Sequence, residues 1–497
     1  MKVAFVYPDA ESIGVQSLMS VLEKEGHEVD FVFYSANDSY TNFVNHDLDF
    51  AALAGKVAEL APDVVAFSAV SDIFKSQVRV AAELKKISGA TTIFGGIHPT
   101  LLPKETLARD EVDALAMGEA EVSLPRWLAS LKVNGSVIMP DKATNGIIHK
   151  RNGSMIGDFT IGDLPNMDEL PFPNKEPFMA YLPEMKDEYL AMTGRGCPYA
   201  CSYCAYSYTN GGGRKRNIRQ TNVDRVIAEF KRAKEHLGVK YFVLVDDCFT
   251  THTEWLEEFC RKYKTEVGLP FQCITSPFQQ NEHKADLLKE AGCVNVQMGV
   301  QSVSEDLCRD ILFRKSNNKK IEEAIAMTKA RGIMVRVDHM LGVPEDTVEN
   351  QEDAMRFYNK VRPDGISVFW LKYYPKTKII DQAVTSGLMT ESEAAEINDP
   401  NLEQPSDPSF YYGGSVSDAR RLAAVAFILH WLPHLPRWFV NFLVNTGTYR
   451  IFAIKNFYLS IAIPRLITCM TDKRDFRATS HVKRFVKRYS GKLNPFN

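Results

Sequence analysis

Three cysteines, Cys197, Cys201 and Cys204, lie on one short stretch of the chain with the spacing Cys-x3-Cys-x2-Cys. Gly194 and Gly196 precede them and let the backbone turn tightly. Three thiolates this close together are suited to binding a metal centre. Zinc in a structural site normally has four protein ligands, and no fourth cysteine or histidine is near in sequence. An iron–sulfur cluster held by three cysteines would leave one iron open to a small molecule. The spacing therefore predicts such a cluster, with a zinc knuckle or three unrelated thiols as the alternatives.

The residues around these cysteines, from Thr193 to Cys204, resemble the signature of the radical S-adenosylmethionine (SAM) enzymes. In that signature an aromatic residue stands just before the last cysteine, and here it is Tyr203. The resemblance implies a four-iron four-sulfur (4Fe-4S) cluster whose open iron binds SAM. It further implies that an electron from the cluster cleaves SAM to methionine and a 5′-deoxyadenosyl radical, which abstracts hydrogen from an unactivated C–H bond. A reductant such as flavodoxin or ferredoxin would supply the electron.

The composition is that of a folded protein with several domains. A chain of 497 residues with 45% hydrophobic and 24% charged residues is expected to form two or three domains. The net charge of −3 argues against a nucleic-acid partner. None of the nine cysteines lies in the first 196 residues, which fits a reducing cytoplasm better than a disulfide scaffold. The N-terminus begins as a strand rather than as a secretory signal, and no uncharged apolar run is long enough to span a membrane.

Short apolar runs alternate with helical patterns over residues 1–140, which predicts an α/β domain with a doubly wound parallel sheet. In such a sheet, ligands bind beyond the carboxyl ends of the strands. The loops there are rich in small and polar residues. Gly95-Gly96 would either let a bulky ligand approach the backbone or simply turn the chain. The expected strands are Val3–Tyr7, Glu28–Tyr34, Asp63–Ser68, Thr91–Phe94 and Val112–Met117.

Two segments of this region, Gly95–Thr100 and Val112–Glu121, resemble the cobalamin-binding domain that precedes the radical core in a large radical SAM subfamily. The resemblance implies a Rossmann-like cobalamin-binding domain over residues 1–140. Where cobalamin domains with an axial histidine have Asp-x-His-x-x-Gly, this chain has Asp9-Ala-Glu-Ser-Ile-Gly14. No histidine of that loop is therefore expected to bind cobalt, and a domain that keeps the fold without the cofactor is the alternative. The residues expected to contact cobalamin are Ser68, Ser71, Gly95, Gly96, His98, Gly118 and Glu119.

Residues 141–188 are rich in proline, asparagine, aspartate and glycine, and we expect a linker there. Residues 189–390 alternate strands and helices again, and the family resemblance implies a radical SAM core with a partial (β/α)6 barrel of the TIM type. The expected strands are Tyr189–Thr193, Tyr241–Val245, Phe271–Ser276, Asn295–Val300, Met334–Leu341 and Ile366–Tyr373.

Several strand ends of this barrel are expected to hold SAM. Asp246 and Asp247 follow one strand, where a carboxylate could bind the ammonium group of SAM. Gly299-Val-Gln-Ser302 resembles the family's Gly-x-Glu-Ser motif, but Gln301 replaces the glutamate and removes its charge. Arg336 is expected either to meet a carboxylate or to form a structural ion pair. The SAM-binding candidates are Tyr203, Asp246, Asp247, Gln301, Ser302 and Arg336.

Residues 391–497 are expected to form a mainly helical C-terminal domain. Apolar stretches such as Leu422–Leu432 and Trp438–Val444 are too short to span a bilayer, and residues 470–497 contain eight Lys/Arg against two Asp. Aromatic-rich amphipathic helices with a basic tail suit the surface of an anionic membrane. The alternative is a helical cap that packs on the barrel and closes the active site, with a solvated tail.

The family resemblance implies cobalamin-dependent methylation of an unactivated carbon, and the apolar C-terminal stretches favour a hydrophobic small molecule as substrate, such as a lipid, an isoprenoid or a tetrapyrrole. The alternatives are radical oxidative cyclisation or carbon–carbon bond formation with a vestigial cobalamin domain, and a zinc-stabilised binding protein. Methylthiolation of RNA or protein is disfavoured, because the enzymes that catalyse it carry cysteines for a second cluster in their N-terminal domain. We expect a cytoplasmic enzyme, either free or attached peripherally to the inner membrane face.

Overall fold

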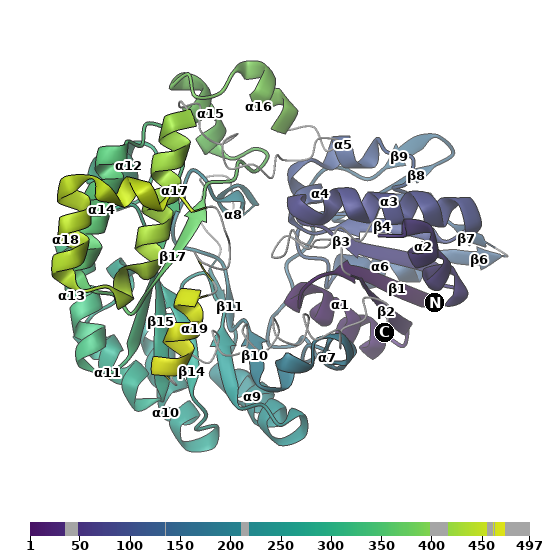
Figure 1. Cartoon of the computed structure of the whole chain (residues 1–497). Helices are drawn as coiled ribbons and strands as arrows, with labels where there is room; N and C mark the ends of the chain where they lie inside the picture. The colour runs from purple at the N-terminus through teal and green to yellow at the C-terminus, as the bar shows by residue number, and fades with distance from the viewer. Residues whose placement is uncertain are drawn as a thin grey trace.

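Two β-sheets, each built mainly of parallel strands, lie side by side and set the positions of the candidate residues (Figure 1). The computed structural model describes residues 1–34, 48–134, 136–209, 218–397, 416–454, 461 and 463–472. One sheet belongs to an N-terminal domain with helices on both faces, and the other forms an open barrel. Together with the C-terminal helices, they make the α/β architecture that the sequence predicts.

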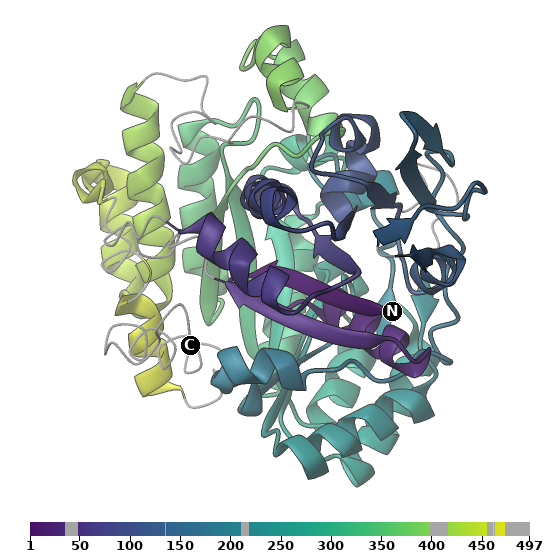
Figure 2. The same ribbon diagram turned by 90° about the vertical axis from the view of Figure 1, so that its right-hand side faces the viewer.

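The N-terminal sheet begins with five parallel strands, and all five predicted strands are confirmed. Apolar side chains lie on both faces of these strands, which explains why helices cover both faces. Figure 2 views the ribbon from the side of this domain. Helices α1 (Ile13–Lys24) and α6 (Ser123–Ser130) pack on one face, and α2 (Phe50–Glu59) and α3 (Ser71–Ile87) pack on the other. The strands are β1 (Lys2–Pro8), β2 (Glu28–Tyr34), β3 (Val64–Ser68), β4 (Thr91–Gly95) and β5 (Ala114–Ala116), in the order β2-β1-β3-β4-β5. Two short helices, α4 (Ile97–Leu101) and α5 (Pro103–Leu107), follow β4.

Part of the segment expected to be a linker instead completes the N-terminal sheet. Strand β8 (Ile147–Arg151) pairs antiparallel with β5, and β9 (Ser154–Ile156) pairs antiparallel with β8. Asn152 and Gly153 join them with positive φ angles, the two-residue hairpin turn that Asn-Gly favours. These strands are too short to show an alternating apolar pattern, and the segment around them is rich in proline. For these reasons the sequence predicted a linker where the structure has two strands. The remaining elements here are the hairpin β6 (Lys132–Asn134) and β7 (Ser136–Ile138), and helix α7 (Glu176–Tyr181), whose Phe178 is buried in the core under α1.

Six parallel strands form the partial barrel, and the six predicted strands are confirmed. Along one of them Val296, Met298 and Val300 are buried against the outer helices, whereas Gln297 alternates with them and faces the interior. The strands, in their spatial order, are β10 (Glu188–Ala191), β13 (Tyr241–Leu244), β14 (Phe271–Thr275), β15 (Cys293–Gln301), β16 (Met334–Leu341) and β17 (Gly365–Trp370). The helices between them are α9 (Val223–Leu237), α10 (Thr253–Glu266), α11 (Glu282–Glu290), α12 (Glu305–Asp310), α13 (Asn318–Ala330) and α14 (Val348–Val361).

The C-terminal helices pack on the barrel. Helices α17 (Val416–Trp431) and α18 (Arg437–Thr446) bury Val425 and Leu443 in the same apolar core as the barrel strands. Asn359 of α14 donates a hydrogen bond to Asn441 Oδ1 of α18 (2.8 Å). Within the described ranges, none of the helices is long and apolar enough to cross a membrane. Residues 473–497, with most of the basic tail, lie outside the described residues, so membrane contact stays a prediction. The other helices are α15 (Lys378–Thr385), α16 (Glu391–Ile397) and α19 (Ile463–Thr471).

Candidate active site

The three cysteines lie on the loop between β11 (Gly194–Arg195) and α8 (Ala205–Thr209), beyond the carboxyl end of β10. Gly196 has a φ of 111°, a left-handed conformation that glycine adopts without strain. Ser202 fixes the loop to the barrel, because its backbone N–H donates to the carbonyl oxygen of Leu312 (3.0 Å). Its hydroxyl donates to the carbonyl oxygen of Ile311 (2.6 Å). The chain itself therefore holds the cysteine loop in shape.

The cysteine sulfurs lie in surroundings that suit an anionic cluster. Cys201 is buried, whereas Cys197 and Cys204 are half-buried. Arg314 donates hydrogen bonds to Cys201 Sγ (3.5 Å) and to the carbonyl oxygen of Gly299. Burial raises the pKa of Cys197 to about 12, so the free thiol is neutral and metal binding must displace its proton. A guanidinium beside one sulfur offsets the negative charge that thiolate ligands bring.

The described residues contain no group of three or more His, Cys, Asp or Glu side chains that could hold a single metal ion. A four-iron cluster binds each of its cysteines through a different iron, so its ligands do not converge on one point. The loop with its three cysteines, its anchored backbone and its neighbouring arginine fits such a cluster.

Asp246 contacts the segment that leads into the cysteines, and its predicted SAM contact stays a prediction. Its carboxylate accepts hydrogen bonds from the backbone N–H of Thr193 (3.1 Å to each oxygen) and from the Thr193 hydroxyl (2.8 Å). The side chain is buried, and burial raises the pKa of the carboxyl to about 6 although these donors act to lower it. Asp246 therefore holds the segment that leads into the cysteines. Its neighbour Asp247 is exposed, and its charge acts on the thiols of Cys197 and Cys204, so it is the carboxylate that a ligand can reach.

Gln301 ends β15 in a left-handed conformation with a φ of 71°, which is strained for a residue with a side chain. The pairing of β15 with β16 shifts register between Gly299 and Gln301, so a local irregularity redirects the end of the strand. Ser302 is buried, and its hydroxyl accepts a hydrogen bond from the backbone N–H of Ser304 (3.2 Å). Backbone strain of this kind occurs at ligand sites, and in this chain also at turns such as that of Asn152. The SAM contact of Gln301 stays a prediction, while Ser302 shapes the turn.

Two further SAM candidates are Arg336, which lies away from the carboxyl end of its strand, and Tyr203, which lies beneath the cysteine loop. Arg336 is the third residue of β16 and packs against Gly365, in the amino-terminal half of the strand. Ligands of barrels of this type bind at the opposite, carboxyl end. Tyr203 packs against the apolar cluster that contains Leu307 and Tyr373, and burial raises the pKa of its hydroxyl. Tyr203 therefore supports the cysteine loop from the barrel side.

A cavity of about 250 Å³ opens at the carboxyl ends of the N-terminal strands. The barrel contributes Met192, Arg195 and Tyr206 to its wall. Helix α8, which starts directly after Cys204, packs against α4 of the N-terminal domain. The cavity and the cysteine loop therefore adjoin each other between the two sheets. The predicted cobalamin residues that line the cavity are Ser68, Gly95, Gly96, Gly118 and Glu119.

The other two predicted cobalamin residues, Ser71 and His98, contact each other, and their cobalamin contacts stay predictions. Ser71 Oγ lies 2.9 Å from His98 Nδ1, and the imidazole stacks on Phe74. Burial lowers the pKa of His98 to about 4, so the ring is neutral. Gly96 has a φ of 94°, and a Cβ there would lie 2.7 Å from the carbonyl oxygen of Ala69. The tight turn alone therefore explains why position 96 is glycine, whether or not a ligand binds there.

Glu11 occupies the position of the axial histidine in the Asp-x-His-x-x-Gly pattern. Its carboxylate forms an ion pair with Lys175, and both side chains are almost completely buried. Lys175 also donates a hydrogen bond to the carbonyl oxygen of Leu190 in β10 (2.6 Å). The side chain at the histidine position is therefore committed to linking the N-terminal domain to the barrel.

Two family models match the chain, one over each sheet. The B12 binding domain model matches residues 3–128, and the radical SAM superfamily model matches residues 192–358. The chain belongs to the radical SAM enzymes that carry a cobalamin-binding domain. The cofactors of this radical SAM enzyme are accordingly a 4Fe-4S cluster, SAM and cobalamin.

Its relatives include a methyltransferase and a cyclase. An uncharacterized methyltransferase of Pyrococcus horikoshii is 25% identical over 407 residues, which cover 78% of this chain and 84% of that protein. The anaerobic magnesium-protoporphyrin IX monomethyl ester cyclase of Rubrivivax gelatinosus is 22% identical over 76% of this chain and 68% of the cyclase. The cobalamin-dependent radical enzyme OxsB, solved with aqua-cobalamin and SAM bound, has the same fold, with a TM-score of 0.60. That match has 14% sequence identity and covers 98% of this chain and 75% of OxsB.

The sequence interpretation did not include Arg195, Glu121 or Tyr206 among the site residues. Arg195 stands inside the Gly-Arg-Gly-Cys segment, where the glycines and the cysteine explain the pattern without it. Glu121 ends the Gly-Glu-Ala-Glu loop, and Tyr206 follows the last cysteine by two residues. For Arg195 and Glu121 the available signal is a charged residue within a segment that already matches a motif; Tyr206 has no such signal.

Proposed function

We propose that this radical SAM enzyme methylates a carbon atom of a hydrophobic substrate with the help of cobalamin. The observation that supports this most is the shared position of the two cofactor regions. Met192 and Tyr206, on either side of the cysteine loop, line the cavity of the cobalamin-binding domain. A substrate bound there would be within reach of both regions. When bound, the cluster with SAM supplies a 5′-deoxyadenosyl radical, and cobalamin supplies a methyl group.

The chain's own residues would hold these groups and exclude water. In the proposal Cys197, Cys201 and Cys204 bind the cluster, and Arg314 offsets its charge. Asp247 is the exposed carboxylate among the SAM candidates, its charge acts on Cys204, and it would accept hydrogen bonds from the ammonium group of SAM. Ser68 and the glycines around the cavity would let the corrin approach the backbone.

Two exposed apolar side chains support a hydrophobic substrate. Met192, at the end of β10, is 41% exposed and lines the cavity. Phe369 is 49% exposed and lies on the face of β17 opposite Val368 and Trp370, which pack against the outer core. Large apolar side chains that face an open barrel interior are typical of sites that bind apolar ligands. Lipids, isoprenoids and tetrapyrroles are the substrate classes that we propose.

The test is an anaerobic reaction of reconstituted enzyme with methyl-labelled SAM, a reductant and a lipid extract of the host, followed by mass spectrometry. Label in a lipid or pigment would support carbon methylation. Formation of 5′-deoxyadenosine without label transfer would favour the cyclase-type reaction instead. Absence of extractable corrinoid after reconstitution would refute the cobalamin route. The control is a variant with all three cysteines replaced by alanine, which is expected to bind no iron and to form no 5′-deoxyadenosine.

We also propose a reducing compartment with flavodoxin or ferredoxin as electron donor. The eight cysteines whose side chains are described are all free thiols.

We further propose attachment to an anionic membrane, because Trp438 of α18 and the nearby Ile451 are 71% and 73% exposed. Flotation with anionic vesicles tests it, and protein that stays at the bottom of the gradient would exclude it.

A further inference from the structure

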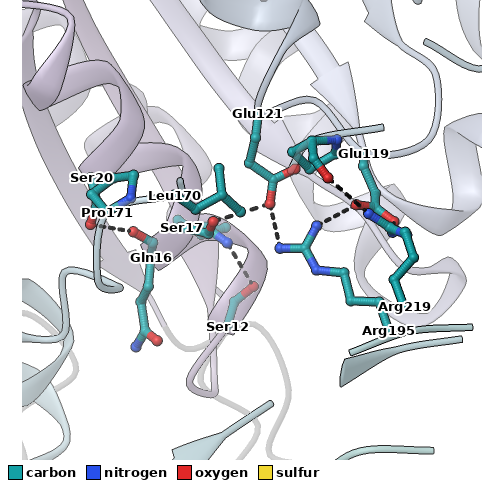
Figure 3. A network of polar contacts seen from close by, with 12 residues as sticks. Ser12, Gln16, Ser17, Ser20, Glu119, Glu121, Leu170, Pro171, Arg195 and Arg219 are labelled. Carbon is teal, nitrogen blue, oxygen red and sulfur yellow. Dashed lines mark hydrogen bonds and ion pairs between the residues drawn. The ribbon is translucent and has the colours of Figure 1, made fainter. Parts of the chain in front are cut away.

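Four charged side chains join the two domains beside the cavity (Figure 3). Arg195 donates hydrogen bonds from Nη1 to Glu119 Oε2 (2.5 Å) and from Nη2 to Glu121 Oε1 (2.6 Å). Arg219 forms a second ion pair with Glu119. The hydroxyl of Ser17 in α1 donates a hydrogen bond to Glu121 Oε1 (3.0 Å). We call the four residues Arg195, Arg219, Glu119 and Glu121 the interdomain clamp.

The clamp connects the loop that lines the cavity to the segment that leads into the cysteines. Glu119 directly follows Gly118 in that loop, and Arg195 lies two residues before Cys197. Arg195 stands opposite Arg219 in the antiparallel pairing of β11 with β12 (Arg219–Gln220). Two like charges in such a position repel each other. Because Glu119 binds both guanidinium groups, the geometry of this ribbon depends on the docked N-terminal domain.

The clamp is shielded from water, which makes it more rigid than a surface ion pair. The side chain of Arg195 is 16% exposed, and that of Glu121 is 5% exposed. Burial acts to raise the pKa of Glu121, but the charge of Arg195 and its hydrogen bond hold this pKa below its usual value. The Glu121 carboxylate is therefore ionised at neutral pH while it binds Arg195.

We propose that Arg195 is a positioning residue that fixes the cysteine loop relative to the cobalamin cavity. This inference rests on the proposed function, because only a reaction that uses both cofactors depends on their separation. A displacement of about 1 Å between reacting groups can cost about a hundredfold in rate. Loss of Arg195 is therefore expected to slow the methyl transfer between the two sites much more than SAM cleavage, which is confined to the barrel.

The first test uses the cofactor-free protein and compares Arg195→Ala and Glu119→Gln with wild type by hydrogen exchange. Exchange of the backbone amides in residues 118–124 and 193–197 is expected to rise about tenfold in both variants. The matched control is Arg331→Ala, because Arg331 also binds two carboxylates, Glu282 and Asp286, and is 17% exposed, but lies entirely within the barrel. Unchanged exchange in Arg195→Ala and Glu119→Gln would overturn the inference.

The second test uses reconstituted proteins with equal iron and corrinoid content. Two rates are measured: formation of 5′-deoxyadenosine, and transfer of labelled methyl from SAM to the bound corrinoid. Both reactions contain a reductant, which supplies the electron for SAM cleavage and keeps the corrinoid reduced, so that methyl transfer to it releases S-adenosylhomocysteine. In Arg195→Ala the methyl transfer is expected to fall about a hundredfold, while 5′-deoxyadenosine formation stays within about threefold of wild type. Arg195→Lys keeps the charge but cannot bind two carboxylates with one planar group, so it should lie between these values.

Equal loss of both rates would show a general structural defect and overturn the positioning role. Transfer at the wild-type rate in Arg195→Ala would also overturn it. If wild-type protein itself transfers no label to the corrinoid, the proposed function fails, and the exchange experiment still decides whether the clamp holds the loop.

Discussion

Arg314 allows a quantitative test of the candidate cluster site. Its guanidinium lies 3.5 Å from Cys201 Sγ and donates a second hydrogen bond to the carbonyl oxygen of Gly299. It also lies 5.7 Å from the centroid of the Tyr199 ring. The substitution Arg314→Gln removes the positive charge and keeps a polar amide. Because a nearby positive charge stabilises the reduced, more negative cluster, its removal is expected to lower the reduction potential.

The magnitude follows from this contact. Coulomb's law with an effective dielectric constant of about 20 gives roughly 5 kcal/mol for two unit charges at the observed separation. An added electron is spread over the cluster rather than placed on one sulfur, which reduces the difference between oxidation states to about 2 kcal/mol. For a one-electron couple, about 2 kcal/mol corresponds to roughly 90 mV. We therefore expect the cluster of Arg314→Gln to have a potential about 90 mV more negative than wild type.

The assay is a redox titration of reconstituted protein followed by electron paramagnetic resonance, with iron content matched between samples. Lys315→Gln is the control, because Lys315 is the next residue and is exposed, so that solvent screens its charge. Its potential is expected to stay within about 20 mV of wild type. An Arg314→Gln potential as close as that to wild type would refute the electrostatic role of Arg314.

Three further predictions concern stability and ligand binding. Gly96→Ala is expected to destabilise the protein by at least about 2 kcal/mol in denaturant unfolding, because of its positive φ and the contact with Ala69, whereas Gly89→Ala, with open space around it, should be near neutral. Asp246→Ala should cost roughly 3 kcal/mol, because it leaves the Thr193 donors unpaired, and should also lower iron content; normal stability and iron content would contradict this. Burial raises the pKa of Asp346 to about 7, above its value in the unfolded chain. The protonated carboxyl therefore favours the folded state at low pH, and the free energy of unfolding falls as pH rises from about 4 to 7. Asp346→Asn should flatten the decline in unfolding free energy across that range, and an unchanged slope would argue against the shift.

Local sequence patterns were sufficient to predict the strands and helices. The roles of the site side chains depend on contacts between residues that are distant in sequence. The strand Met334–Leu341 was predicted at both ends because its apolar run is bounded by glycines at 332 and 342. The contact between Asp246 and Thr193 could not be predicted, since the two residues are 53 positions apart and both lie next to recognisable motifs. A strand-end carboxylate looks the same in sequence whether it binds a ligand or holds a neighbouring strand.

The same ambiguity affects the strand-end loops of the cobalamin-binding domain, and the structure resolves part of it. Glu11 and Glu119 both stand in loops that the family resemblance assigns to cobalamin, yet their carboxylates bind cations of the linker and the barrel, Lys175 and Arg195. A domain that had lost cobalamin would still need these carboxylates to hold the barrel, so their presence does not bear on whether the cofactor is used.

The cavity does bear on whether cobalamin is used. Ser68 and Gly95 border a space of about 250 Å³ next to a close-packed sheet. Larger apolar side chains would fill such a space and stabilise the domain if no ligand occupied it. The small residues that border this space are therefore those expected of a domain that binds cobalamin.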